Sequence, residues 1–181
     1  MTRERQRLTR LPNADDCAEL LRRHGCEGQV VNHSMAVSAL AVKIARRCGA
    51  DTDLVLVGGI LHDIGRCRTH GIHHAVIGAE MVRAEGLPEA VAAIVERHIG
   101  AGLSEDEASE LGLPARDFLP LTLEEKVVAH ADNLTSGELR RPVADVLVAL
   151  ARRGLAGPAV RMMNLHKELS SLCGVDIDDI R

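Results

Sequence analysis

Apolar residues recur at intervals of three and four along most of this 181-residue chain, and this spacing constrains its fold more than any other feature. Val37, Leu40, Ala41 and Ile44 form one such stripe, and Gly49 follows where the stripe ends. Side chains three and four residues apart share one face of an α-helix, and glycine is common just past a helix end. The pattern therefore predicts amphipathic helices that turn their apolar faces toward a common core.

This pattern predicts an all-α fold of about eight helices in one domain covering residues 1–181. The run Leu54–Leu61 is apolar apart from two glycines, and it would suit a buried strand as well as a helix. We favour a helix there, because the neighbouring segments are helical in pattern and no partner strand is visible. The expected helices cover about residues 13–24, 31–48, 53–61, 74–85, 88–98, 122–134, 143–150 and 162–173, with capping boxes beginning at Ser104 and Thr122.

The segment from 28 to 135 is expected to form the core of the helical bundle, and helices within 143–173 to pack on it. The acidic tail 175–181 is expected to be peripheral. No unbroken apolar stretch is long enough to span a bilayer, and the charged N-terminus lacks the apolar core of a signal peptide. We therefore expect a cytoplasmic protein with no membrane partner.

Composition also excludes several kinds of site. The five cysteines include no C-x-x-C pair, which argues against a disulfide framework or a zinc ribbon and favours reduced, mostly buried thiols. The net charge is −4, and the chain has no Trp, no Tyr and a single Phe, at Phe118. Stacking of bases on aromatic side chains is thus nearly unavailable, and there is no strong nucleic-acid signal.

Histidine is the compositional anomaly, with nine residues, of which five fall between His62 and His98. At the end of the apolar run, His62-Asp63 places an imidazole and a carboxylate side by side. Such a pair could be a structural hydrogen bond, or it could belong to a metal site. The choice depends on which other polar residues can converge on it.

Six polar residues on five expected helices occupy positions that face or adjoin the core. Burying imidazoles and carboxylates is costly unless they are paired or bound to metal, so a shared metal site is the favoured interpretation. Nitrogen and carboxylate ligands without cysteine suit Mn, Fe, Co, Ni or Zn, and a carboxylate such as Asp63 can bridge two ions. His70 and His73 stay open as alternatives to His74. The six residues are His33, His62, Asp63, His74, His98 and Asp132.

The order His33, then His62-Asp63, then Asp132 resembles the HD superfamily of metal-dependent phosphohydrolases, and Ile-Leu-His-Asp-Ile-Gly at 60–65 resembles its HDIG signature. The resemblance covers roughly residues 28–135 and implies a helical bundle of the HD-domain type. Arg-Thr-His-Gly-Ile, Glu-Arg-His-Ile-Gly-Ala-Gly and Ala-His-Ala-Asp-Asn-Leu are also similar to stretches of uncharacterised small archaeal HD proteins.

The resemblance implies that His33, His62, Asp63 and Asp132 hold one metal ion and that Asp63, His74 and His98 hold a second. Asp63 would be the central catalytic ligand. Arg66 stands where the family's signature often continues with lysine, and its guanidinium could bind a substrate phosphate. Arg68 and Arg97 could do the same, or could be ordinary solvated charges, and Thr69 could add a hydroxyl.

The function implied by the resemblance is that of a phosphomonoesterase or phosphodiesterase. It would use one or two divalent transition-metal ions, Fe or Mn being favoured over Co, Ni or Zn, to cleave a small-molecule phosphate or nucleotide. Two alternative functions are a di-iron oxygenase that uses the same ligand set and a regulatory module that binds a nucleotide without turnover. The chain could also form a homo-oligomer.

Histidines outside the ligand set are expected to be structural. His130 would be structural or exposed, and His24 and His166, which have no convergent partners in the sequence pattern, would lie at the core edge or surface. Asn133 could orient the neighbouring Asp132 or be a surface residue.

Overall fold

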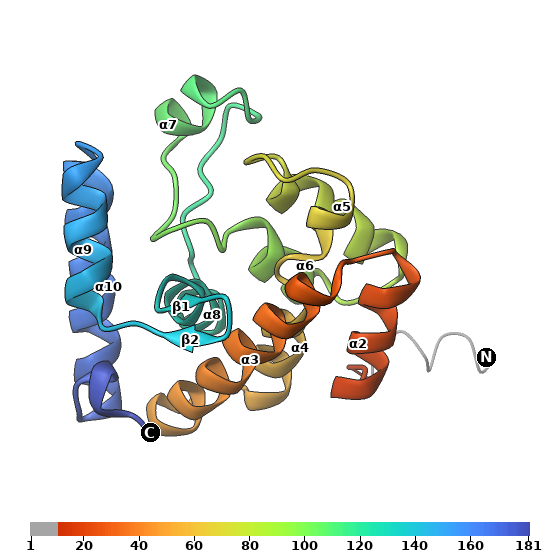
Figure 1. Cartoon of the computed structure of the whole chain (residues 1–181), viewed down its shortest axis with the longest axis horizontal. Helices are drawn as coiled ribbons and strands as arrows, with labels where there is room; N and C mark the ends of the chain where they lie inside the picture. Colours follow the sequence, from red (N-terminus) through yellow and green to blue (C-terminus); the bar gives the residue numbers. More distant parts are fainter. Residues whose placement is uncertain (1–10) are drawn as a thin grey trace.

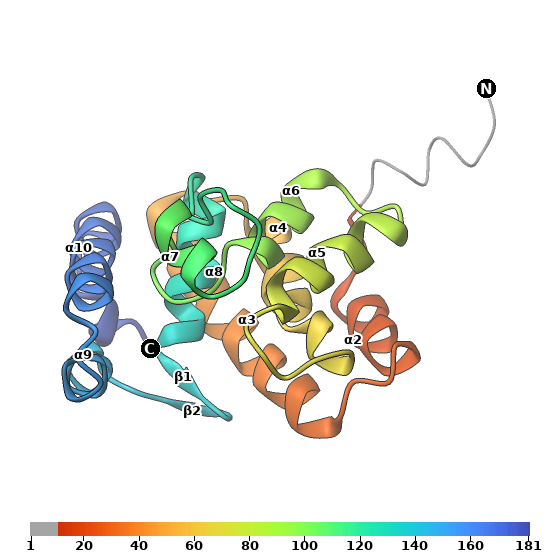
Figure 2. The ribbon, with the colours of Figure 1, turned by 90° about the horizontal axis from the view of Figure 1, so that it is seen from above.

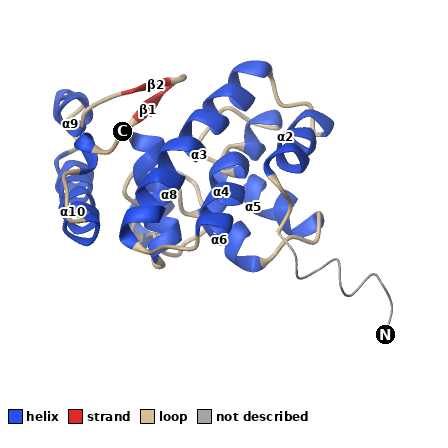
Figure 3. Ribbon diagram, turned by 90° about the horizontal axis from the view of Figure 1, so that it is seen from below, coloured by secondary structure: helices blue, strands red, loops and turns tan. Residues whose placement is uncertain are grey.

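The computed structural model of the protein describes residues 11–181 and confirms the all-α fold class (Figures 1 and 3). The expectation drawn from the N-terminus lies outside the described residues. None of the described helices is long and apolar enough to cross a membrane. The elements are α2 (Ala14–Arg23), α3 (Gly28–Cys48), α4 (Thr52–Leu61), η1 (Ile64–Cys67), α5 (His74–Ala84), α6 (Glu89–Glu96), α7 (Glu105–Glu110), α8 (Leu123–Asn133), β1 (Thr135–Ser136), β2 (Leu139–Arg140), α9 (Val143–Arg152), α10 (Ala156–Cys173) and η2 (Ile177–Asp179).

Helix α4 lies at the centre of the molecule, where it contacts α2, α3, α6 and α8 (Figures 1 and 2). Its side chains reach two apolar clusters, with Val55 in the cluster of α3, α8 and α10 and Val57 in the cluster of α2, α5 and α6. A helix that packs against neighbours on most of its surface has almost no polar face, which explains why Leu54–Leu61 carries no helical periodicity. The choice of helix over strand for this run is confirmed.

Two glycines of α4 allow its neighbours to approach closely. A Cβ added to Gly58 would lie 2.7 Å from the Cδ1 atom of Ile94 on α6, and a Cβ on Gly59 would lie 2.8 Å from the Cα atom of Ser38 on α3. Contacts this short are not found between real Cβ atoms and their neighbours. The glycines weaken helix propensity, but here they let α3 and α6 pack directly against the backbone that carries His62.

The helix ends largely follow the sequence signals. Asn13 and Ser104 form complete capping boxes at the starts of α2 and α7. The capping box expected at Thr122 is only half present. The Thr122 side chain accepts the Glu125 backbone N–H, but the Glu125 carboxylate accepts from the Leu121 N–H and from Arg97 instead of from the capping residue.

Two features differ from expectation. Between α8 and α9 the chain forms an antiparallel hairpin, β1–β2, in which Thr135 pairs with Arg140 and Ser136 with Leu139. The tail 175–181 is not peripheral, because Ile177 and Ile180 are fully buried in the cluster of α3, α8 and α10. The acidic residues of the tail face outward around these two isoleucines, which hid its apolar character in the sequence.

Candidate metal centre

The six polar residues selected from the sequence lie together at the heart of the fold. His33 is on the first half of α3, His62 caps the end of α4, and Asp63 follows it. His74 is the first residue of α5, His98 follows α6, and Asp132 is in the last turn of α8. The fold thus brings together ligand-type side chains from five helical regions, as the sequence analysis expected.

Gly65 allows the turn after Asp63 to meet the start of α5. A Cβ added to Gly65 would lie 2.0 Å from the carbonyl oxygen of His74 and 2.8 Å from the backbone nitrogen of Gly78. No side chain fits this space, so only glycine lets η1 lie against α5. The close approach places the side chains of Asp63 and His74 next to each other.

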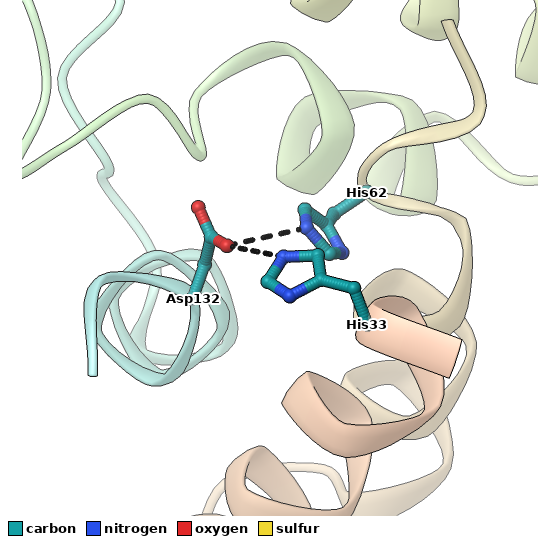
Figure 4. Close-up of side chains that lie close together, drawn as sticks. All are labelled: His33, His62 and Asp132. Atoms are coloured by element: carbon teal, nitrogen blue, oxygen red, sulfur yellow. Dashed lines mark hydrogen bonds and ion pairs between the residues drawn. The ribbon is translucent and has the colours of Figure 1, made fainter. Parts of the chain in front are cut away.

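One half of the site is formed by His33, His62 and Asp132 (Figure 4). The Oδ1 atom of Asp132 lies 3.0 Å from Nε2 of His33 and 3.4 Å from Nε2 of His62. Each of the three residues offers one ligand atom within 4.8 Å of the others. This spacing suits three ligands of a single ion.

The other half is formed by Asp63, His74 and His98. The Oδ1 atom of Asp63 lies 3.1 Å from Nε2 of His74 and 3.5 Å from Nε2 of His98. Its other oxygen, Oδ2, lies 3.7 Å from Nε2 of His62 and 4.0 Å from Nε2 of His33. The two oxygens of Asp63 therefore face different halves of the site, an arrangement in which a carboxylate can bridge two ions.

All four histidines turn Nδ1 toward a main-chain carbonyl. The acceptors are the oxygens of Gly137 for His33 at 2.8 Å, and of Gly59, Gly71 and Val95 for His62, His74 and His98 at 2.7 Å each. A carbonyl oxygen only accepts, so each Nδ1 carries the proton. In the neutral ring the lone pair is then on Nε2, and all four Nε2 atoms point into the site.

Several polar atoms in the site lack the partners that buried groups normally have. The Nε2 atom of His62 and the Oδ1 atom of Asp63 are buried and make no hydrogen bond of acceptable geometry. The Nε2 atoms of His74 and His98 are 3.0 Å apart, with no proton available between two neutral rings. Unsatisfied lone pairs converging at short range fit a bound cation, so the residues present suit a metal ion.

The electrostatics of the site also favour the binding of a positive charge. Burial alone would lower the pKa of His62, but the carboxylates of Asp63 and Asp132 raise it to about 9. Burial would raise the pKa of both carboxyl groups, yet the neighbouring imidazoles, His62 foremost, hold each far below its usual range. Desolvation lowers the pKa of the fully buried His98. The carboxylates thus stay ionised and attract a cation.

The six site residues differ in how far they are exposed to solvent. The side chains of His62, Asp63, His74 and His98 are at most 4% exposed, whereas those of His33 and Asp132 are 18% and 22% exposed. A small molecule would therefore approach past His33 and Asp132. The side chain of Arg66 is also accessible, at 33% exposed.

The three candidate arginines differ in their availability. The Nε atom of Arg66 donates to Oδ2 of Asp63 at 2.6 Å, and its terminal nitrogens make no hydrogen bond with the described residues. Arg97 does not suit a phosphate, because its Nη1 atom lies 3.0 Å from both oxygens of the buried Glu125. Arg68 is exposed, and the Thr69 hydroxyl accepts the backbone N–H of Gly71.

Of the three neighbouring histidines, His74 is the one that reaches the cluster. His70 and His73 are exposed, and the Nε2 atom of His73 lies 3.1 Å from the carbonyl oxygen of Gly112. Asn133 donates to the carbonyls of Gly100 and Ala129, so its amide braces the end of α8 and is not directed at Asp132.

The expectation that His24 and His166 lack partners is wrong. His24 lies 2.8 Å from a carboxylate oxygen of Glu85. The buried rings of His130 and His166 meet at 3.0 Å, and His166 lies 3.1 Å from Oδ1 of Asp176. The contacts of His24 with Glu85 and of His130 with His166 join residues far apart in the chain, and no local pattern in the sequence signals them.

The sequence matches the family of HD domains over residues 30–137, which include all six site residues. The chain belongs to the HD domain family. This finding confirms the resemblance seen in the HDIG-like motif. In structure, the protein is similar to the HD domain of the L. monocytogenes phosphodiesterase PgpH in complex with cyclic-di-AMP, with a TM-score of 0.52, 18% identity, and coverage of 81% of this chain and 91% of that one.

Curated relatives of this HD-domain protein carry several names. It is 49% identical to the uncharacterized protein MJ0778 of Methanocaldococcus jannaschii, over 81% of this chain and 91% of that protein. It is 45% identical to the tRNA (cytidine(56)-2'-O)-methyltransferase of Thermoplasma volcanium, over 94% of this chain and 50% of that protein. Ribonuclease Y of Thermosipho melanesiensis is 35% identical over 59% of this chain and 18% of the enzyme. The chain thus spans only half the length of the methyltransferase.

Proposed function

We propose that this HD-domain protein is a metal-dependent phosphohydrolase that cleaves a phosphate ester of a nucleotide or of another small molecule. The arrangement of Asp63 is the observation that carries the proposal, because its two oxygens face two separate groups of inward-pointing Nε2 atoms. His33, His62, Asp63 and Asp132 would hold the first ion, and Asp63, His74 and His98 the second. Histidine and carboxylate ligands suit Fe, Mn, Co, Ni or Zn.

Ions bound at these positions would supply the chemistry that activates water and neutralises charge on a phosphoryl group. The protein's own residues supply the geometry. Asp63 orients Arg66 by accepting from its Nε atom, and the terminal nitrogens of the guanidinium make no hydrogen bond with the described residues. A planar guanidinium held in this way can bind two phosphate oxygens, so Arg66 would position the substrate.

The names of the relatives favour a nucleotide over other phosphate esters. They are called a ribonuclease, a tRNA methyltransferase and a phosphodiesterase whose HD domain was crystallised with cyclic-di-AMP. Phe118, the one large aromatic side chain, is buried away from solvent and offers no stacking platform. Recognition would therefore rest mainly on phosphate and sugar, with a base held by aliphatic or arginine contacts.

The test is metal analysis of protein purified without chelator, followed by a hydrolysis screen with Mn, Fe, Co and Ni. Substrates would include nucleotides, cyclic dinucleotides, dinucleoside polyphosphates and short RNA, and D63N would be the matched inactive control. We expect one to two ions per chain and hydrolysis in at least one substrate class. Bound metal without hydrolysis of any substrate would refute the phosphohydrolase, and oxygen consumption by an iron-loaded sample would then favour the oxygenase.

A further inference from the structure

His33 differs from the other three histidines of the metal centre in how its ring is oriented. His62, His74 and His98 each donate Nδ1–H to a carbonyl three residues earlier in the chain. The acceptor for His33 is the carbonyl of Gly137, 104 residues away. Three rings are thus held by their own local turns, whereas the orientation of His33 depends on tertiary structure.

The acceptor lies in the turn of the β1–β2 hairpin. Gly137 has a φ of +59°, a left-handed conformation that suits glycine and directs its carbonyl at His33. The neighbouring residues strengthen this contact, because the amide of Asn32 donates to the carboxylate of Glu138 at 3.0 Å. Two consecutive residues of α3 therefore hold two consecutive residues of the hairpin turn.

The first strand of the hairpin begins beside another residue of the same half-site. Asp132 lies in the last turn of α8, and β1 starts at Thr135, whose hydroxyl donates to the carbonyl of Ala131 at 2.7 Å. The hairpin thus begins just after the helix that carries Asp132, and its turn contacts His33. It links His33 and Asp132, the two most exposed members of the site.

The second strand is anchored in the C-terminal tail. The guanidinium of Arg140 donates to the carbonyls of Ile177 and Ile180, whose side chains are buried in the core. The carboxylate of Asp178 accepts the backbone N–H of Val143, which fixes the start of α9 directly after the hairpin. The tail therefore holds the second strand and the residues after it, while the turn of the hairpin contacts His33.

We propose that the β1–β2 hairpin and the C-terminal tail together form a positioning element for His33, and that this element sets the affinity of the metal position formed by His33, His62 and Asp132. The carbonyl of Gly137 accepts the hydrogen bond from the His33 ring, and the side chain of Arg140 binds the hairpin to the C-terminal tail. The inference rests on the proposed metal binding. Groups that orient a metal-ligating histidine typically change metal affinity about 10- to 100-fold when they are lost.

The test compares two glycines of the same backbone type. Gly137 and Gly154 both have positive φ, and neither has another atom within 4 Å of an added Cβ, but only the carbonyl of Gly137 contacts the metal centre. A β-branched residue is strained at positive φ, so valine should displace either turn. Each substitution would be made in H98A, which leaves only the position near His33, and Co²⁺ affinity would be measured by chelator competition.

We expect G137V to weaken Co²⁺ binding about 10- to 100-fold relative to H98A alone, and G154V to leave it unchanged. In metal-free protein, long-range ¹H–¹⁵N spectra should show that G137V loses the hydrogen-bonded Nδ1–H signal of His33, while the thermal unfolding temperatures of the two variants fall alike. A merely structural role for the hairpin would not change this Nδ1–H signal.

R140Q provides an independent variant if G137V does not fold. Its control is R141Q, because the side chain of Arg141 makes no hydrogen bond or ion pair with the described residues. We expect R140Q alone to weaken Co²⁺ binding. Affinities within twofold of the parent in both G137V and R140Q would overturn the positioning role. Absence of Co²⁺ binding by the unmodified protein would instead overturn the proposed function.

Discussion

The Nε2 atoms of His74 and His98 lie 3.0 Å apart in the buried half of the candidate metal centre, although the Nδ1 proton of each ring is donated to a main-chain carbonyl. In their neutral forms the two rings therefore face each other with lone pairs. Such a contact is unfavourable in a low-dielectric interior unless a cation or a proton lies between the nitrogens. The metal-free protein should thus be less stable than the metal-loaded one.

The first prediction is that transition-metal ions stabilise the folded protein. A ligand that binds only the native state at 100 times its Kd adds about 2.7 kcal/mol, and each kcal/mol raises Tm by about 2–4 °C for a chain of this size. Calorimetry of chelator-treated protein titrated with Mn²⁺ or Co²⁺ should show a concentration-dependent rise in Tm. Identical unfolding curves with and without metal would contradict the assignment of the centre.

The second prediction concerns the two halves of the site. Because Asp63 directs one oxygen to each half, D63N should lose both ions, whereas H33A and H98A should each lose one and keep the other. Elemental analysis per chain would measure this directly. H24A is the matched control, since His24 pairs with Glu85 on the surface and should leave the metal content unchanged.

Activity should follow metal content. The metal centre is expected to contribute several kcal/mol to transition-state stabilisation, and each 1.4 kcal/mol is a tenfold change in rate. D63N should therefore lower hydrolysis by about a thousandfold or more while its helical CD spectrum is retained. A variant that kept two ions and full activity would remove Asp63 from the centre of the mechanism.

Helical periodicity indicates only part of the site, because His33, His74 and His98 are the residues that align with an apolar face. His62-Asp63 and Asp132 lie at core-adjacent positions, and the resemblance to the HD superfamily adds weight to them. His33 is four residues before Val37, and His98 continues the stripe of Val91, Ile94 and Val95, so both had to face the core if the helices formed. The division of the site into halves could not be seen in this way. It depends on the positions of His33, His62, His74 and His98 around the two oxygens of the Asp63 carboxylate, and these positions arise from tertiary packing.

Contacts between distant segments account for the features that sequence analysis missed. The hairpin at Thr135–Arg140 is too short for an alternating pattern, and its role arises only because Gly137 meets His33. Likewise Ile177 and Ile180 are isolated apolar residues in an acidic tail, and their burial depends on the surface that α3, α8 and α10 present together. Local patterns carry no information on such pairings.

The third prediction is that Gly65 is indispensable to the geometry around Asp63. An added Cβ would overlap the backbone of His74, which cannot move aside as a flexible side chain could. Overpacking of this kind costs about 1–3 kcal/mol or more, so G65A should lose about 3 kcal/mol of stability and bind metal more weakly. Denaturant unfolding would measure the loss.

Gly28 is the matched control for Gly65, because it lies at the first position of α3 with nothing within 4 Å of an added Cβ. G28A should be neutral or slightly stabilising, by up to about 1 kcal/mol, because alanine reduces the entropy of the unfolded chain. Equal stability of G65A and G28A would show that η1 and α5 can separate without cost.

The fourth prediction is a pH-dependent link between α7 and α10. The carboxylate of Glu107 accepts from Arg161 at 2.7 Å and from the backbone N–H of Ser104 at 2.9 Å. The bond from Arg161 is the main reason that the pKa of Glu107 lies below its ordinary value of 4.5. A carboxyl group whose pKa is lower in the folded state binds fewer protons there than in the unfolded chain, so folding is favoured while it is ionised.

The stabilising contribution of Glu107 should therefore be complete above its ordinary pKa and should disappear as the pH falls through the lowered value. At neutral pH, E107Q should cost about 1 kcal/mol, since one partly exposed ion pair and one capping bond are weakened. E110Q is the control, because Glu110 is on the same helix and pairs with none of the described residues. In urea unfolding from pH 7 to pH 3, the wild type and E107Q should converge at the acidic end. A stability difference that stayed constant over this range would mean that the carboxylate charge does not hold α7 to α10.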